Sequence, residues 1–145
     1  MEPERPENLP ETGEEAEEGS EALTQGIRVV VRSRYEEERS SPEESYFFFA
    51  YTVRILNEGP ETAQLWSRRW LITDGDGNQE VVEGPGVVGH QPVLAPGESF
   101  EYTSFCPLPT PVGAMEGTYR MIVTDGEDFE ARIAPFTLAT PSAVN

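Results

Sequence analysis

The sequence predicts an all-β protein built as an antiparallel β-sandwich of about seven or eight strands. Two observations predict this class. Short segments within residues 27–145 alternate apolar and polar side chains with a period of two, which is the pattern of half-buried strands. The same stretch contains ten Pro and ten Gly, spaced so that no long helix fits between them.

The chain begins with an acidic segment. Residues 1–26 contain nine Glu, one Arg and three Pro, with few apolar side chains. Such a segment buries too little apolar area to offset the entropy lost on ordering. We therefore expect residues 1–26 to be a disordered tail, or an acidic ligand for a basic partner, and residues 27–145 to form the domain. A chain starting at Gly26 is then expected to fold with unchanged stability.

Strands are predicted at eight places, where apolar residues recur at every second position. The segment 47–55 is the clearest, with five apolar side chains on one face. The segment 65–73 places Trp66 and Trp70 on one face around Arg68. In chain order, the predicted strands cover residues 27–35, 47–55, 65–73, 79–83, 99–106, 118–124, 129–133 and 136–139.

Turn-forming sequences separate these strands. Asn57–Pro60, Ala95–Gly97 and Asp125–Glu127 combine Gly or Pro with polar residues, and Asp74–Asn78 has the Asp-Gly pattern of a hairpin. Pro135, between the last two strands, suits a bulge or an edge. This many strands and turns in about 120 residues are typical of a fibronectin type III or immunoglobulin-like sandwich. The single cysteine excludes the Cys–Trp–Cys pattern of a true immunoglobulin domain.

Composition excludes several classes of partner. The chain has 145 residues, with ten Arg, no Lys and 27 Asp plus Glu, and its formal net charge is −17. This balance argues against binding to nucleic acids or anionic membranes, which requires clustered positive charge. No apolar run approaches the roughly 20 residues of a membrane-spanning helix, and the acidic start is unlike a signal peptide. We therefore expect a cytoplasmic protein with neither a nucleic-acid nor a membrane partner.

The segment Gly84–Gly89 spells G-x-G-x-x-G. In dinucleotide-binding folds this motif joins a strand to a helix whose N-terminus receives the pyrophosphate. Pro92 and Pro96 follow closely, so no helix of useful length can form. One interpretation is a structural loop, which requires a positive φ for at least one of its glycines. The other is a weak anion site formed by backbone amides. That site would comprise Gly84, Gly86, Val87, Val88 and Gly89.

Carboxylates in one hairpin imitate a calcium loop without completing it. Asp74, Asp76 and Asn78 match the start of an EF-hand loop, but Gln79 and Pro85 occupy positions that need Gly and Glu. One His and one Cys cannot form a closed transition-metal site without several carboxylates. We predict no metal site and no cofactor.

No catalytic constellation is visible. His90 is the only histidine, the residue type that most often serves as a general base at neutral pH. Ser99 and Ser104 follow it, but nothing resembles a nucleophile elbow or a triad. Cys106 is expected to be a small packed apolar residue. We therefore predict no catalytic residue and no enzymatic activity.

Aromatic residues indicate where a partner could bind. The chain has seven Phe, five Tyr and two Trp, most of which belong in the core. Trp66, Arg68 and Trp70 share a strand, and Phe105 precedes the Pro-rich loop 107–111. If exposed, this set would suit a protein partner, because aromatic residues and Arg are enriched in binding hot spots. Otherwise it is a core in which Arg stacks over Trp. An exposed edge strand could also pair two copies into a homodimer.

A series of motifs recurs in an order and spacing that match one family. They lie at Trp70–Gly75, Gly84–Pro92, Leu94–Glu98, Phe100–Ser104, Thr110–Tyr119 and Pro135–Ala139. Over residues 27–145 the chain closely resembles the ApaG family, also called CorD, with departures from the commoner pattern at His90 and Phe105. The resemblance implies a fibronectin type III-like sandwich.

The resemblance also implies a class of function. Bacterial members of that family are linked genetically to cobalt and magnesium tolerance and lie near a diadenosine-tetraphosphate hydrolase gene. In eukaryotic relatives the domain is fused to an F-box protein and to a polymerase-delta-interacting protein, where it resembles an interaction module. No enzymatic activity is established for the family. We therefore expect a non-catalytic protein-interaction module, with nucleotide or pyrophosphate binding at the glycine motif as the alternative.

Overall fold

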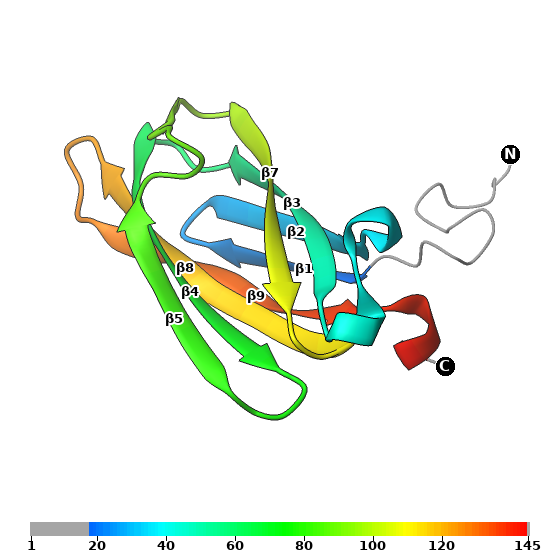
Figure 1. Cartoon of the computed structure of the whole chain (residues 1–145). Helices are drawn as coiled ribbons and strands as arrows, with labels where there is room; N and C mark the ends of the chain where they lie inside the picture. Colours follow the sequence, from blue (N-terminus) through cyan, green and yellow to red (C-terminus); the bar gives the residue numbers. More distant parts are fainter. Residues whose placement is uncertain (1–17, 145) are drawn as a thin grey trace, which may run out of the picture.

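The computed structural model describes residues 18–144 and contains two antiparallel sheets packed face to face (Figure 1). The first sheet has the strand order β1-β2-β3-β7, and the second has the order β5-β4-β8-β9 with the short β6 paired to β4. The strands are β1 (Glu18–Thr24), β2 (Ile27–Tyr35), β3 (Phe47–Asn57), β4 (Ala63–Asp74), β5 (Gln79–Pro85), β6 (Val93–Leu94), β7 (Ser99–Leu108), β8 (Val112–Val123) and β9 (Phe129–Ala139). Three short 3₁₀ helices are η1 (Glu37–Arg39), η2 (Pro42–Glu44) and η3 (Pro141–Val144). The predicted all-β sandwich is confirmed, with nine strands in the described residues.

The core lies between the two sheets and is filled by the inward side chains of the alternating strands. From the first sheet, Phe49, Val53 and Ile55 of β3 are completely buried. They face Leu65 of β4 and Tyr119 of β8, which are equally buried. Burying one such side chain contributes about 1.5–3 kcal/mol relative to leaving it exposed. The period-two pattern of the sequence therefore identifies the face of each strand that holds the sheets together.

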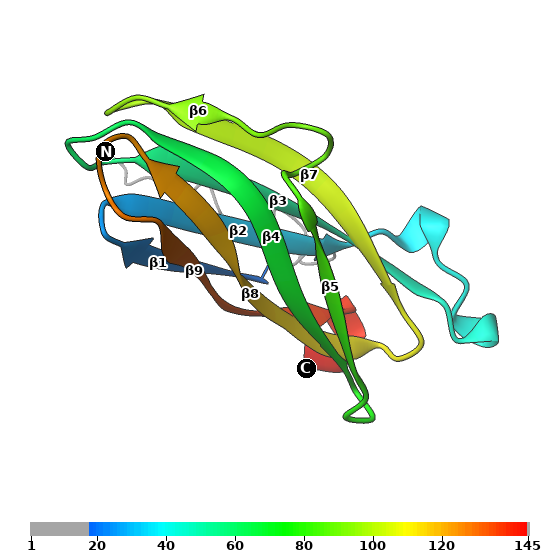
Figure 2. The same cartoon turned by 90° about the vertical axis from the view of Figure 1, so that its left-hand side faces the viewer.

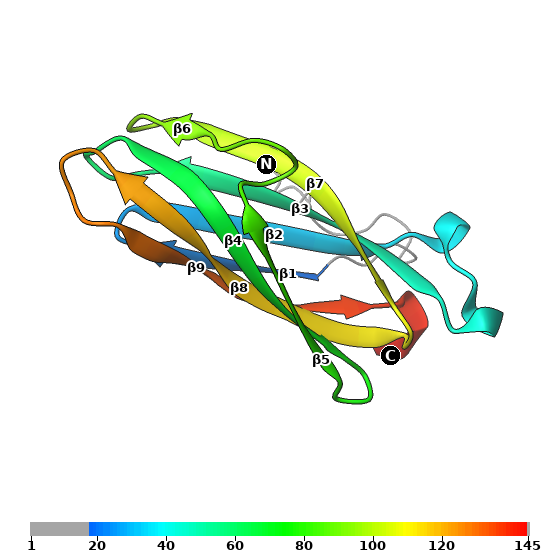
Figure 3. The ribbon, with the colours of Figure 1, turned by 60° about the vertical axis from the view of Figure 1, so that its left-hand side comes forward.

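The two long edges of the sandwich are built differently. At one edge β1 and β2 lie against β9 (Figure 2). The hydroxyls of Ser20 and Ser33 donate to backbone carbonyls of β9, and that of Thr24 accepts from a β9 amide, at distances of 2.7–3.0 Å. At the other edge lie β5 and β7, which share no paired register within residues 18–144 (Figure 3). The sandwich is thus closed at one edge and open at the other.

Strand β1 corrects the predicted start of the domain. The sequence predicts that residues 18–24 belong to the acidic tail, but they pair along their whole length with β2. The positions on the side of the other sheet hold Glu18, Ser20, Ala22 and Thr24, and with no large apolar side chain among them they give almost no hydropathy signal. The strand forms through its backbone hydrogen bonds and its contact with β9. The remainder of the predicted tail, residues 1–17, lies outside the described residues.

The C-terminal half differs from expectation in strand length. Strand β8 begins at Val112, six residues before the predicted start, and β9 is continuous where two strands were expected. The bulge suggested for Pro135 is present, because the register of β8 and β9 shifts between Met115 and Gly117. The shift leaves Pro135 between the residues that pair with these two positions. A bulge absorbs the proline without ending the strand.

Candidate functional site

The glycine motif forms the end of β5 and a tight turn. Gly84 lies in β5, and a Cβ on it would approach the guanidinium of Arg68 to 3.0 Å. Gly86 has φ +62°, and a Cβ there would lie 2.3 Å from the carbonyl oxygen of His90. Gly89 has φ +84° with open space around it. The expected positive φ is therefore confirmed for two of the three glycines, and Gly84 and Gly86 have packing reasons for lacking a side chain.

Several backbone amides of the loop already donate hydrogen bonds within the protein. The amide of Val87 donates to the carbonyl of His90, and that of His90 donates to Val87, both at 2.8 Å. These bonds close a two-residue turn with positive φ at Val88 and Gly89, as in a type I′ turn. The amide of Gly86 donates to a carbonyl of β4 at 2.9 Å. Of the five residues proposed for an anion site, Gly86 and Val87 thus have engaged amides, and the site stays a prediction.

Arg68 points at this loop and bonds its carbonyl groups. Its Nη1 donates to the carbonyl oxygens of Pro85 at 3.0 Å and Gly86 at 2.9 Å. The guanidinium therefore holds the loop against β4. This contact also accounts for Gly84, since a side chain there would meet the guanidinium.

The proposed partner set of Trp66, Arg68, Trp70 and Phe105 is divided by the fold. A β-bulge between Leu65 and Ser67 inverts the alternation of β4, so Trp66 is 47% exposed while Trp70 is only 2% exposed. The Trp70 ring packs in the core against Tyr51, Tyr119 and Phe136, with centroids 5.3–6.4 Å apart. The expectation that Trp70 binds a partner is therefore wrong, because this ring is part of the core.

Phe105 belongs to a different exposed cluster, the aromatic–arginine patch of Arg39, Tyr46, Phe48 and Phe105. The rings of Phe48 on β3 and Phe105 on β7 are stacked with centroids 5.3 Å apart. The guanidinium of Arg39 lies 5.2 Å from the first centroid and 4.9 Å from the second. Phe105 is 46% and Tyr46 is 42% exposed. Sequence analysis missed Arg39 because it comes from η1, more than 60 residues before Phe105.

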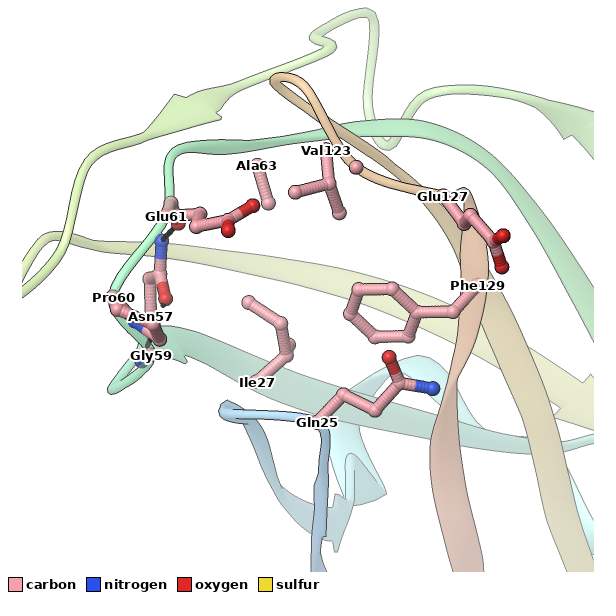
Figure 4. A pocket seen from close by; sticks show the side chains of 11 residues that line it. Gln25, Ile27, Asn57, Gly59, Pro60, Glu61, Ala63, Val123, Glu127 and Phe129 are labelled. Atoms are coloured by element: carbon pink, nitrogen blue, oxygen red, sulfur yellow. Dashed lines mark hydrogen bonds between the residues drawn. The ribbon is translucent and has the colours of Figure 1, made fainter.

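A pocket of about 320 Å³ lies at the end of the sandwich beside the β1–β2 turn (Figure 4). Ile27 and Phe129 form apolar walls, and Glu61 and Glu127 carry carboxylates at its rim. The amide of Asn57 is already used, since it donates to the carbonyls of Glu61 and Leu94 at 2.8 Å. A larger concavity of about 750 Å³ lies at the opposite end, around η1 and η3.

The candidates for catalysis lie apart. The His90 ring packs against Phe100, with centroids 5.7 Å apart, and Ser104 lies opposite Tyr51 in the pairing of β7 with β3. Cys106 is buried, and burial raises the pKa of its thiol to about 11. The thiol is therefore protonated at neutral pH, as expected for a packed residue.

The carboxylates of the Asp74–Asn78 hairpin serve the turn. Asp74 Oδ1 accepts hydrogen bonds from the amides of Asp76 and Asn78, at 2.9 and 3.0 Å. Across residues 18–144, no cluster of three or more His, Cys, Asp or Glu side chains is arranged to hold a metal ion. The same residues include no helix long and apolar enough to cross a membrane.

Comparison with known proteins gives one consistent family. The family model described as the ApaG domain matches residues 37–123. Protein ApaG of Methylobacterium sp. strain 4-46 is 61% identical over 120 residues, which cover 83% of this chain and 92% of that protein. Protein ApaG of Anaeromyxobacter dehalogenans strain 2CP-1 is 58% identical over 126 residues, covering 87% and 99%. The crystal structure assigned to the ApaA protein of Bordetella pertussis is 52% identical with a TM-score of 0.79, covering 83% of this chain and 98% of that one.

Proposed function

Since the chain belongs to the ApaG domain family, we propose that it is a non-catalytic protein-interaction module that binds its partner through the aromatic–arginine patch. The observation that carries this proposal is the stack of Phe105 on Phe48 under Arg39, with Phe105 nearly half exposed. A soluble domain gains stability by burying such rings, so rings left exposed and ordered suit an interface. A few residues supply most of the binding energy at a protein interface, and aromatic residues and Arg are enriched among them.

The position of the patch strengthens the proposal. Phe105 lies on β7, which pairs only with β3 and leaves its other edge without a strand in the described residues. Stacking between the rings and the guanidinium fixes the three side chains before a partner arrives, which lowers the entropy lost on binding. A partner segment can therefore contact the patch and approach the free backbone of β7 together.

We include a link to cobalt and magnesium tolerance as part of this proposal. It is implied by the resemblance to the family, and a module of this kind would act through a partner that handles these ions. Carboxylates at exposed loops contact hard cations only weakly. The metal effect is therefore assigned to the complex and to no residue of this chain.

Nucleotide or pyrophosphate binding is the second candidate. It is favoured by the turn Val87–His90, where the adjacent amides of Val88 and Gly89 donate to no other described residue. Two neighbouring backbone amides can hold one anionic oxygen pair. NMR titration with pyrophosphate, ATP and diadenosine tetraphosphate tests this candidate, repeated with Mg²⁺ and Co²⁺. Saturable shifts confined to residues 87–90 support it, and unchanged spectra at millimolar ligand remove it.

Site-specific photocrosslinking tests the interaction module. A photoreactive residue at Thr103, exposed on the outer side of β7, is compared with one at Glu116, exposed on the outer side of β8. We expect a discrete crosslinked polypeptide at Thr103 that disappears in the Phe105→Ser variant and never forms at Glu116. A product of twice the mass of the chain would identify the partner as a second copy. Background labelling at both positions would contradict the proposal.

A further inference from the structure

The outer face of the first sheet concentrates arginine in a strongly acidic chain. Outward positions of β2 and β3 hold Arg28, Arg32, Arg34 and Arg54, while β1 and β7 add only the acidic residues Glu21 and Glu101. Arg39 of the patch lies at the same face. Half of the ten arginines of the chain are thus gathered here, although the formal net charge is −17.

Within residues 18–144, three of these guanidinium groups lack a carboxylate partner. Arg28 pairs with Glu21 and Glu58, and Arg34 pairs with Glu36 at 3.0 Å. Arg32 and Arg54 are exposed, and no ion pair or hydrogen bond of their side chains occurs within residues 18–144. Arg54 lies opposite Glu101 in the register without such a pair. Arg39 contacts rings in place of a carboxylate.

The outer face of the second sheet has fewer arginines without a carboxylate partner in the described residues. Arg69 pairs with Glu83 at 2.9 Å, and Arg120 pairs with Asp128 at 3.3 Å. These arginines therefore have neutralising partners within the sheet and its loops. Arg132 of β9 is the exception on this face, because it is exposed without an ion pair in the described residues. Three arginines without a carboxylate partner within residues 18–144, Arg32, Arg39 and Arg54, lie on the face that also carries the aromatic–arginine patch.

Arg32 lies in a row of small residues that crosses the outer face of the first sheet. The row that contains Arg32 continues through Thr52 and Thr103, whose hydroxyls bond each other at 2.8 Å, and begins at Gly19. In the next row Ala50 lies opposite Phe105 and is completely covered by its neighbours. The small residues in the row of Arg32 leave its side chain exposed.

We infer that the outer face of the first sheet binds an acidic, extended protein segment, with carboxylates on Arg32 and Arg54 and an apolar side chain on the ring of Phe105. This inference rests on the proposed interaction module and names the chemistry of its partner. Carboxylates match planar guanidinium groups well. A short acidic segment suits the face better than a nucleic acid, whose dense phosphate charge would be repelled by the net charge of the whole chain.

Fluorescence anisotropy with a defined probe tests the inference. The probe is a labelled peptide of about eight alternating Glu and Phe residues, compared with the same peptide carrying Gln in place of Glu. We expect the full chain to bind the Glu peptide saturably. Affinity should fall at least about tenfold in the double variant Arg32→Gln/Arg54→Gln, because two charge-assisted contacts are lost. Added salt should weaken binding for the same reason.

The matched control is the double variant Arg69→Gln/Arg120→Gln, which changes the net charge equally on the other sheet. Its affinity should stay within about twofold of the parent. Equal weakening by both double variants, or no preference for Glu over Gln, would overturn the inference. If the Glu peptide fails to bind while crosslinking at Thr103 still depends on Phe105, the acidic chemistry is wrong and the interaction module stands. If crosslinking also fails, both are wrong.

Residues 1–17 of the same chain are the competing acidic segment. They contain seven Glu and one Arg, and they join β1 at Glu18, which lies opposite Ser33 between Arg32 and Arg34. A full-length variant with those seven Glu replaced by Gln separates the two occupants. Peptide binding at least about tenfold tighter than in the parent would make the chain's own segment the occupant and overturn an external partner. Unchanged affinity supports the external partner.

Discussion

The closed and open edges of the sandwich join the two sheets with different chemistry. At the closed edge, hydroxyls of β1 and β2 hydrogen-bond the backbone of β9. Toward the open edge, Tyr102 of β7 and Tyr119 of β8 are buried and their hydroxyls bond each other. At the closed edge one partner of each hydrogen bond is a backbone group of β9, which no substitution can remove. At the open edge both partners are side chains, and both can be replaced. The two edges should therefore respond differently to mutation.

Deletion of residues 1–26 should have the largest effect, because it removes the whole of β1 from the closed edge. The loss includes the pairing with β2 and the hydrogen bonds of Ser20 and Thr24 to β9. We expect destabilisation of about 4 kcal/mol and a fall in melting temperature of more than about 10 °C. Differential scanning calorimetry measures this change.

A chain that starts at Glu18 is the matched control, since it keeps every residue of β1. The difference between the two truncations isolates the contribution of the strand. An unchanged melting curve for the chain without residues 1–26 would restore the boundary expected from the sequence. It would also show that the closed edge does not need β1.

The contrast between β1 and β3 explains how much of the fold could be predicted. In β3, large apolar residues at every second position fill the core, so the sequence identifies the strand and its buried face. In β1 the inward side chains are small or polar, and the strand exists because β2 and β9 are beside it. Pairing partners far along the chain are not visible in local alternation.

The same limit applies to the candidate site. The aromatic side chain of Phe105 and its position before the Pro-rich loop predict a partner residue. Trp70 is wrongly grouped with it, because a one-residue bulge reverses the faces of β4. Arg39 could not be found because its contact with Phe105 depends on the path of η1. A bulge and a loop path are set by tertiary contacts and leave little local signal.

The second largest effect should come from Gly86→Ala, at the loop beside the open edge. A Cβ at Gly86 meets the carbonyl oxygen of His90 at 2.3 Å in a backbone with φ +62°. We expect a loss of about 2–3 kcal/mol by urea unfolding. Gly89→Ala adds a Cβ into open space at φ +84°, so only backbone strain remains and about 1 kcal/mol is expected. Equal effects of the two variants would show that the close contact with His90 is relieved cheaply.

Tyr119→Phe should cost about 1–2 kcal/mol, because it leaves the buried hydroxyl of Tyr102 without a partner. Adding Tyr102→Phe removes that orphaned hydroxyl and should recover much of the loss. Ser33→Ala gives the comparison at the closed edge, where the orphaned group is the carbonyl of Thr137 and no second substitution can remove it. Unfolding in urea measures all three. A double variant less stable than Tyr119→Phe would contradict the distinction between the edges.

The smallest effect on stability should appear in alkaline solution, where the buried phenols near the open edge respond to pH. Burial raises the pKa of the Tyr102 and Tyr119 phenols above the ordinary value near 10. The stability that depends on their neutral forms is complete below pH 10 and is lost as pH rises above it, because the unfolded chain ionises first. At pH 10 half of the unfolded-state phenols are ionised, which costs about 0.4 kcal/mol for each.

The variant Tyr102→Phe/Tyr119→Phe should therefore lose about 0.8 kcal/mol less stability than the parent between pH 8 and pH 10, measured by urea unfolding. The buried Cys106 and Tyr51, whose pKa values are also raised by burial, remain in both proteins and cancel in the difference. Equal losses in the two proteins would mean that the phenols ionise as readily in the folded chain, and that solvent reaches the open edge.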